Sequence, residues 1–133
     1  IFIKNQCFSH VQIRGSVPSF WKQAGITQEV SIDPNWQRNK LAFKRHIDKI
    51  LKNYHKMLCV NLLCLDRAGE DELTYCYENL IKECQLKDVR YEYFDVIALQ
   101  KVKNFRDVII SLLKSCMELI DILVIIVRNY HKK

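Results

Sequence analysis

Residues 57–65 read MLCVNLLCL, a near-continuous apolar run that contains a single asparagine and is bounded by charged residues. A run of this length and character is typical of a strand that is buried on both faces of a parallel sheet. We therefore expect this segment to be a sheet strand covered by other elements on both sides.

The segments around this run alternate between helical and strand patterns. Apolar residues recur at helical spacing over residues 41–54, 72–84 and 102–120, whereas residues 89–94 and 123–127 are rich in β-branched or aromatic residues. The segment 123–127 could instead be the tail of the preceding helix. This alternation predicts an α/β fold with a mainly parallel or mixed sheet flanked by helices.

The amino-terminal part predicts a strand followed by a turn and a long connection. Residues 7–13 are short and apolar and precede Arg14-Gly15-Ser16, which is typical of a strand that ends in a tight turn. Residues 22–39 are polar, contain the turn signal Asp33-Pro34-Asn35, and are interpreted as a connection with a short strand at 29–32.

Two polar groups are candidates for a binding site because each lies at a predicted strand end. Ligands of open parallel sheets bind at the carboxyl ends of the strands, where Arg14 and Asp95 are expected. Arg14 could bind phosphate or brace the turn, and Asp95 could position a catalytic group or cap a helix. Gly15 is expected to meet a backbone requirement, and Ser16 to bond within the turn.

The composition predicts a folded protein without a cofactor. Hydrophobic residues make up 49% of the chain, which argues against disorder, and the longest apolar run is far below the ~20 residues that span a bilayer. The six cysteines form no CxxC pair and no Cys/His cluster of zinc spacing, so we expect free thiols and no metal. These features predict a cytoplasmic protein.

The positive charge is concentrated in one segment. Residues 38–56 contain seven basic residues and one acid, Asp48. The net charge of this segment is therefore +6, which equals the formal net charge of the whole chain. Arg45, Lys49, Lys52 and Lys56 follow one another at helical spacing and form a predicted basic stripe. This stripe could be a solvated helix face or could contact an anionic membrane surface. Nucleic-acid binding is not expected, because no helix-turn-helix, RRM or zinc pattern accompanies the charge.

Residues 11–21, VQIRGSVPSFW, resemble a signature of the Sac family of phosphoinositide phosphatases. The family's A-F-[DK]-R-H helix, V-N-L strand and F-D pair have similar counterparts at residues 42–46, 60–62 and 94–95. Order and spacing agree over roughly residues 8–120, and the nearest likeness is to synaptojanin-like Sac domains. The family often has histidine two residues after the aspartate, where this chain has Ile97.

The resemblance implies a phosphatase that removes inositol-ring phosphates through a cysteinyl-phosphate intermediate. It implies phosphoinositide lipids as substrates and a peripheral location at endomembranes or the plasma membrane. The whole chain, residues 1–133, then corresponds to the central part of a Sac domain, without the amino-terminal subdomain and the catalytic loop.

The nucleophile motif of the family, Cys-x5-Arg-[Thr/Ser], is not found in the sequence. The string from Cys84 to Arg90 has the spacing but is followed by Tyr91, and it is predicted to run from a helix into a strand. The string from Cys64 to Arg67 resembles half of the catalytic loop, but Asn61 stands where the nucleophile belongs. A phosphate-binding thiolate loop must run from a strand into a helix, a frame that neither cysteine is expected to have. We therefore expect this chain alone to release no phosphate, and a non-catalytic Sac-derived module that binds acidic lipids or a protein partner is the alternative.

Overall fold

The computed structural model describes residues 2–3, 6–7, 12–25, 30–102, 104–117 and 123–127. In chain order the elements are β1 (Phe2–Ile3), β2 (Gln6–Cys7), β3 (Gln12–Gly15), β4 (Trp21–Gln23), β5 (Val30–Ile32), α1 (Trp36–Leu51), β6 (Met57–Asn61), α2 (Glu70–Cys84), β7 (Val89–Tyr93), α3 (Val96–Val102), α4 (Phe105–Met117) and β8 (Leu123–Val127).

A four-stranded sheet of order β3-β8-β6-β7 organises the fold, and every pairing within it is parallel. One register row joins the last residues of the four strands, Gly15, Val127, Asn61 and Tyr93. The carboxyl ends of all four strands therefore meet at one edge of the sheet, hereafter the carboxyl edge, and their starts meet at the opposite amino edge. Two short antiparallel pairs, β1–β2 and β4–β5, lie outside this sheet.

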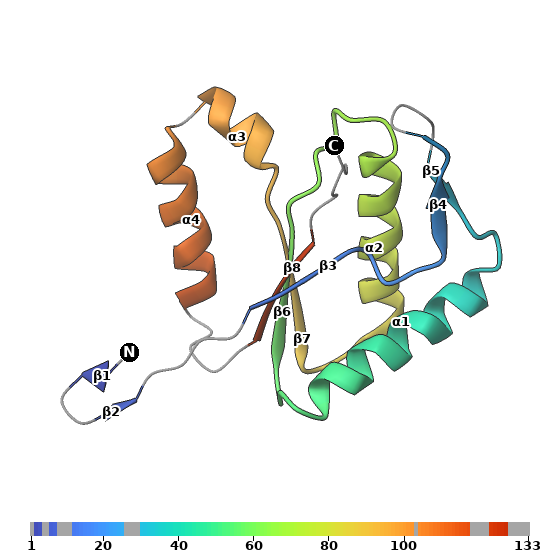
Figure 1. The fold of residues 1–133 in the computed structure, drawn as a ribbon, viewed down its shortest axis with the longest axis horizontal. Helices are drawn as coiled ribbons and strands as arrows, with labels where there is room; N and C mark the ends of the chain where they lie inside the picture. Colours follow the sequence, from blue (N-terminus) through green and yellow to red (C-terminus); the bar gives the residue numbers. More distant parts are fainter. Residues whose placement is uncertain are drawn as a thin grey trace.

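Helices cover both faces of the sheet, as expected for an α/β fold. Figure 1 shows α1 and α2 on one side of the sheet and α3 and α4 on the other, with the β4–β5 pair outside α2. Alternate residues of β6 serve the two layers: Met57 and Cys59 belong to the core cluster that includes Phe43 of α1 and Leu73 of α2. Leu58 and Val60, which point to the opposite face, are also buried. The prediction of a strand buried on both faces is confirmed for Met57–Asn61, whereas residues 62–65 of the predicted run belong to the loop that follows.

Aromatic rings fill the core between the sheet and the first helical layer. Tyr77 of α2 meets Phe43 and Tyr91 edge-on, at centroid distances of 6.0 and 5.3 Å. Such edge-to-face pairs add stabilisation beyond the burial of apolar area. Among the helices of the described residues, none is long and apolar enough to cross a membrane.

Helix α1 begins at Trp36, five residues before the apolar pattern that predicted it. The start is set by Asn35, whose side-chain oxygen accepts the N–H of Arg38 at 3.1 Å. This is an ordinary N-cap, and a capping asparagine extends a helix into residues that lack apolar periodicity. The segment 22–39 is therefore only partly a connection, although the expected short strand is confirmed as β5.

The predicted helix over 102–120 corresponds to α4, and it is preceded by α3, a short helix that was not predicted. Asp95 accepts the N–H of Ala98 at the start of α3, and Asn104 accepts the N–H of Asp107 at the start of α4. Each cap provides a separate helix beginning, so α3 starts well before the predicted segment. The alternative that residues 123–127 continue this helix is wrong, because they form β8 between β3 and β6.

The first strand of the parallel sheet lies later than expected. β3 runs from Gln12 to Gly15, so Arg14 lies within the strand rather than in a turn after it. Strand β4 was not predicted, because three residues are too few to show an alternating pattern. Its pairing with β5 gives it order that the local sequence does not indicate.

Candidate functional site

The candidate residues from β3 and β7 lie at the same edge of the sheet but not together. Arg14 and Gly15 end β3, and Asp95 follows the end of β7 by two residues. Because β8 and β6 separate these two strands, their ends are about 14 Å apart at ordinary strand spacing. The carboxyl edge therefore places Arg14, Gly15 and Ser16 at one end and Asp95 at the other.

Asp95 lies where connections to opposite faces of the sheet diverge. The chain leaves β6 toward α2 on one face and leaves the neighbouring β7 toward α3 on the other (Figure 1). In open α/β sheets the crevice at such a divergence is the usual ligand site. Here, however, the carboxylate is already used by the protein itself: one oxygen accepts the Ala98 N–H at 2.8 Å and the other the Tyr93 hydroxyl at 3.3 Å.

The ionisation of Asp95 reflects these bonds. Burial alone would raise its pKa, but hydrogen bonds from the backbone of Ala98 and Leu65 outweigh this effect, and the pKa lies below its usual value. The side chains of Tyr93 and Cys64 lower the pKa of Asp95 further. The carboxylate is a helix cap that also holds the loop after β6, which is the structural alternative of the two roles predicted for it.

Asn61 holds the start of the loop between β6 and α2. Its oxygen accepts the Leu63 N–H at 3.0 Å, and its amide nitrogen donates to the hydroxyls of Thr74 and Tyr91 at 3.1 and 2.9 Å. The residue is fully buried, so these bonds replace those it would make with water. Asn61 is therefore a structural support at the position where the family motif would need a nucleophile.

Glu70 closes the same loop at its other end. Its carboxylate accepts the Cys64 N–H at 2.7 Å and lies 3.6 Å from the guanidinium of Arg67. Both groups are of the kinds that hold phosphate oxygens in a cysteine phosphatase, a loop amide and an arginine. In this loop they are bonded to an internal carboxylate instead.

The context of Cys64 differs from the expectation. We predicted no strand-loop-helix frame around it, and this was wrong, because Cys64 lies in the loop that joins β6 to α2. The loop between β6 and α2 thus has the strand-loop-helix frame although it lacks the motif. The loop still lacks an open phosphate cradle, since Glu70 takes the Cys64 amide and Arg67.

The prediction for the Cys84–Arg90 string is confirmed. Cys84 is the last residue of α2, and Arg90 lies in the first half of β7, near the amino edge. Burial raises the pKa of the Cys84 thiol, so the thiolate that attack on phosphorus requires is disfavoured.

Two further thiols, those of Cys59 and Cys76, are also unsuited to nucleophilic attack. Burial raises the pKa of Cys59 to about 11 and also raises that of Cys76. Cys59, Cys64, Cys76 and Cys84 are all free and buried, as predicted for this part of the chain. The described residues include no group of three or more His, Cys, Asp or Glu side chains that could hold a metal ion.

The backbone requirement expected at Gly15 is found at Gly69 instead. A Cβ built on Gly15 meets nothing within 4 Å, whereas Gly69 has φ +85° and a Cβ there would collide with the side chain of Val30. The expectation for Gly15 was wrong, because Gly15 is still part of strand β3 and not of a turn. Gly69 is the N-cap of α2, and only the absence of a side chain lets β5 approach this helix so closely.

A cavity beside the β4–β5 pair was missed by the sequence reasoning. It has a volume of about 430 Å³, and its lining residues are Phe20, Trp21, Lys22, Ser31, Ile32, Asp33 and Pro34. Phe20 is 41% exposed and lies under the guanidinium of Arg38, 4.1 Å from the ring centroid. Asp33, the acid of this lining, is paired with the same Arg38 at 2.9 Å, so its carboxylate is already bonded within the protein.

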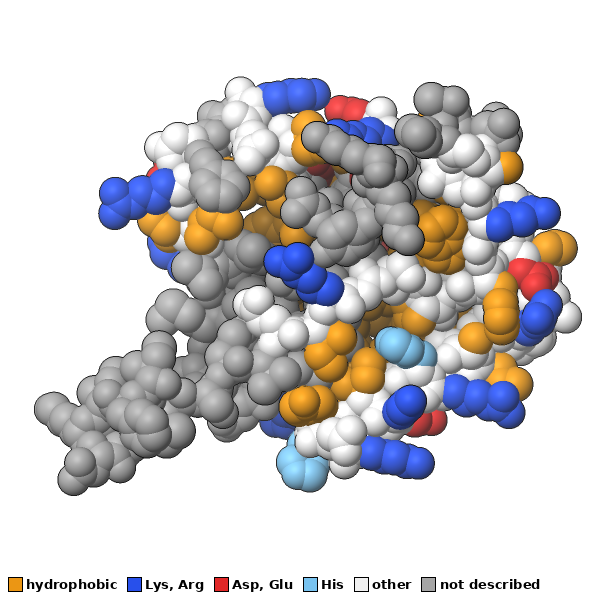
Figure 2. All heavy atoms as spheres, in the orientation of Figure 1, with side chains coloured by type: hydrophobic (Ala, Val, Ile, Leu, Met, Phe, Trp, Pro, Cys, Tyr) orange, Lys and Arg blue, Asp and Glu red, His pale blue; other side chains and the backbone are white. Residues whose placement is uncertain are grey.

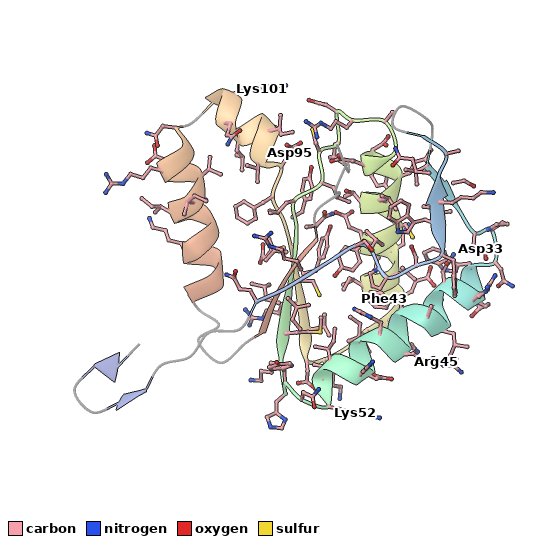
Figure 3. The ribbon with its side chains drawn as sticks, in the orientation of Figure 1. Asp33, Phe43, Arg45, Lys52, Asp95 and Lys101 are labelled. Carbon is pink, nitrogen blue, oxygen red and sulfur yellow. The ribbon has the colours of Figure 1, made fainter. Side chains whose placement is uncertain are left out.

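The predicted basic stripe is exposed and lies away from the carboxyl edge. Arg45, Lys49, Lys52 and Lys56 are all exposed to solvent. Figure 3 labels Arg45 and Lys52 along the lower side of α1, whereas Asp95 and Lys101 lie at the top. Lys52 caps the end of α1 and Lys56 directly precedes β6, so the stripe ends at the amino edge of the sheet.

Comparison with known proteins gives a family match and several relatives. A family model described as the SacI homology domain matches residues 2–101. The chain is 28% identical over 116 residues to human synaptojanin-1, which covers 82% of this chain and 7% of that protein. It is 33% identical over 99 residues to rat synaptojanin-2, covering 71% of this chain and 7% of the relative.

A further relative, from fission yeast, is named as an inositol trisphosphate phosphatase. The chain is 33% identical over 105 residues to the inositol-1,4,5-trisphosphate 5-phosphatase 1 of Schizosaccharomyces pombe, covering 76% of this chain and 10% of that protein. The chain thus spans a tenth or less of the length of these relatives. No solved structure matches it significantly.

Proposed function

This chain belongs to the SacI homology domain family, and on that premise we propose that it forms the central part of a Sac phosphatase domain in a protein that dephosphorylates phosphoinositide lipids. The family match over residues 2–101 is the observation that supports this function. The names of the relatives agree with it, since they include a phosphatase of inositol trisphosphate and a polyphosphatidylinositol phosphatase of Saccharomyces cerevisiae. The protein would act at the cytoplasmic surface of endomembranes or the plasma membrane.

The reaction would proceed through a cysteine that this chain does not supply. A thiolate attacks the phosphorus of a ring phosphate, an S–P bond forms as the bond to the inositol oxygen breaks, and water then hydrolyses the cysteinyl phosphate. No Cys-x5-Arg-[Thr/Ser] string occurs in the sequence, so the nucleophile and its phosphate loop would come from elsewhere in the protein.

The carboxyl edge would contribute supporting groups to this site. Arg14 is exposed at the end of β3, where its guanidinium can bind phosphate oxygens, with Gly15 and Ser16 beside it. Asp95 would hold the loop after β6 in place, because it bonds both the start of α3 and Leu65 of that loop.

Phosphate release from phosphoinositide vesicles tests this proposal. The complete protein should release phosphate, and Arg14→Ala should lower kcat/KM about a hundredfold if the charge-assisted bond is lost. Cys84→Ser is the matched control and should leave activity nearly unchanged, because Cys84 ends a helix at the amino edge. Activity that survives Arg14→Ala but not Cys84→Ser would refute the assignment of the site, and purified residues 1–133 should release nothing above background.

The exposed basic stripe favours a second candidate function. Arg45, Lys49, Lys52 and Lys56 could bind an acidic lipid or a protein partner in a module without catalysis, each contributing up to ~1 kcal/mol at a membrane surface. Co-sedimentation with vesicles at low salt tests the lipid version. Equal sedimentation with neutral and phosphoinositide-containing vesicles would count against it.

A further inference from the structure

The basic stripe lies opposite the side chains that bury α1 against the core. Asn39, Phe43 and Ile47 form the buried side of α1. At 100° per residue, Arg45, Lys49 and Lys52 lie on the far side of the helix from this buried side. These side chains project into solvent along one side of the helix, and the exposed Lys56 follows in the connection between α1 and β6.

The charges of this stripe are not neutralised within the described residues. Arg38 and Lys40, nearer the start of α1, have ion pairs with Asp33 and Glu83, at 2.9 and 3.0 Å. By contrast, no ion pair joins Arg45, Lys49, Lys52 or Lys56 to an acid in the part of the chain that the structure describes. Figure 2 shows the blue side chains gathered over the lower right of the molecule, where α1 lies. The only acid of α1 itself is Asp48, so the surface has a clear positive excess.

The position of the stripe disfavours the membrane that holds the substrate. Under the proposed function, on which this inference rests, lipid head groups reach the carboxyl edge of the sheet. The stripe ends at the amino edge, beyond the five-residue length of β6, which is about 16 Å. A flat bilayer against the carboxyl edge therefore does not meet the stripe.

The apolar content of the stripe also differs from that of a membrane-surface helix. Such helices insert several large apolar side chains below the head groups. The large apolar side chains of α1 face the core. Among the described residues of this helix, Leu41 is the large apolar side chain that is exposed, at 51%. Charge, and not apolar insertion, is what this surface can use for recognition.

The spacing of the charges along α1 is somewhat shorter than that of alternate side chains in an extended chain, by a difference that long basic side chains can span. Arg45, Lys49 and Lys52 are separated by about 6 and 4.5 Å along the helix axis. Side chains on one side of an extended peptide recur every ~6.6 Å, so acidic residues at alternate positions can pair with successive members of the stripe. We propose that the stripe formed by Arg45, Lys49, Lys52 and Lys56 is a docking surface for an extended acidic segment of a partner protein.

Binding of a labelled peptide of alternating glutamate and serine to the 133-residue chain tests this proposal. Fluorescence anisotropy at low salt should show binding that weakens as salt is added, because exposed charges are screened. The double variant Lys49→Glu/Lys52→Glu should bind at least about tenfold more weakly, since two attractions become repulsions.

The matched control reverses two cations elsewhere. Lys22 of β4 and Lys114 of α4 are also exposed, so Lys22→Glu/Lys114→Glu changes the net charge equally without touching the stripe. This variant should bind the peptide within about twofold of the unchanged chain. Circular dichroism should show that both charge-reversed variants keep their helical content. If charge reversal disturbs the fold, the neutral double variant Lys49→Gln/Lys52→Gln replaces it. This variant should lose an intermediate amount of peptide affinity.

Three outcomes would overturn the proposal. They are no peptide binding, an equal loss in both charge-reversed variants, and binding to phosphatidylserine vesicles that the peptide does not displace. Failure of the proposed function would look different, because the complete protein would then release no phosphate while peptide binding persisted. Phosphate release by the complete protein without peptide binding would remove only the docking surface.

Discussion

Three polar side chains at the carboxyl edge of the parallel sheet and two at its amino edge are used in opposite ways. At the carboxyl edge, three side chains form hydrogen bonds with the protein's own backbone and side chains: Asn61, Glu70 and Asp95. At the amino edge Lys52 and Lys56 extend into solvent. An internally bonded polar group supports the fold, and its removal leaves partners unsatisfied, whereas an exposed charge can be changed at little cost in stability. The comparison therefore separates residues that hold the fold from residues that are available for a partner.

The largest effect is expected at Asn61. Asn61→Ala removes an acceptor for the Leu63 N–H and a donor shared by Thr74 and Tyr91, all in a buried setting. Because buried polar groups lose bonds that water cannot replace, the free energy of unfolding should fall by about 4 kcal/mol. Denaturant titration measures this, with Asn53→Ala, exposed after α1, as the control. A loss as small as that of the control would mean that the carboxyl edge is not held by these bonds.

A second large effect is expected at Gly69, for which Gly15 is the matched control. Gly69→Ala places a Cβ against the side chain of Val30 at φ +85°, and the Val30 backbone nitrogen lies 3.3 Å from it. Left-handed strain and overpacking together should lower the free energy of unfolding by about 3 kcal/mol. Gly15→Ala, with open space around its Cβ, should change it by less than about 0.5 kcal/mol. Equal effects at both glycines would contradict the close approach of β5 to α2.

A smaller loss is expected at Asp95. Asp95→Ala removes the cap of α3 and a bond to the loop after β6, which should cost about 2 kcal/mol. Asp95→Asn should lose less than half of this, because asparagine caps helices about as well as aspartate. Thermal unfolding of both variants measures the difference. If Asn and Ala destabilise equally, the carboxylate charge rather than the cap is what matters.

The long elements of the fold were predictable from the sequence, and the reasons are physical. The apolar run of β6 and the helical periodicity of α1 and α2 result from burial against a common core, which the sequence pattern records directly. Caps and short strands were not predictable in this way. The beginnings of α1 and α3 depend on single side chains, Asn35 and Asp95. The cap at Asn35 was not predicted, and the sequence left capping by Asp95 as one of two alternatives that the turn geometry decides.

The candidate site was predictable in position but not in its internal bonding. The α/β pattern placed Arg14 and Asp95 at one edge of a parallel sheet, and both lie there. Strand order is set by long-range pairing, so their separation across β8 and β6 could not be predicted from local pattern. The closure of the Cys64 loop by Glu70 was missed for a similar reason: the acid at the start of α2 resembled an ordinary first-turn carboxylate.

The smallest effect on stability is expected at Glu83. Its exposed carboxylate lies in the last turn of α2, the end of the helix that is nearer to the amino edge. The indole N–H of Trp36 donates to both of its oxygens at 3.0 Å, and the Lys40 ammonium lies 3.0 Å away. The bond from Trp36 and then that from Lys40 lower the pKa of Glu83 below its ordinary value of 4.5, although some desolvation opposes them. A depressed folded-state pKa means that this contribution to stability is present above about pH 4.5 and is lost as the pH falls through the folded-state pKa.

Denaturant titration at two pH values can detect this exposed contact. Glu83→Gln should be less stable than the unchanged chain near pH 7, and the difference should shrink at a pH below the folded-state pKa of Glu83, where the carboxyl is protonated in both states. Trp36→Phe keeps most of the ring packing but removes the indole donor, so it should reproduce part of the same pH dependence. Added salt should weaken the effect, because the carboxylate is exposed and its attraction to Lys40 is screened. The difference in free energy of unfolding between Glu83→Gln and the unchanged chain could instead be the same at both pH values. The Trp36 bond would then not depend on the charge of Glu83, and the amino edge would resemble the carboxyl edge more than the structure indicates.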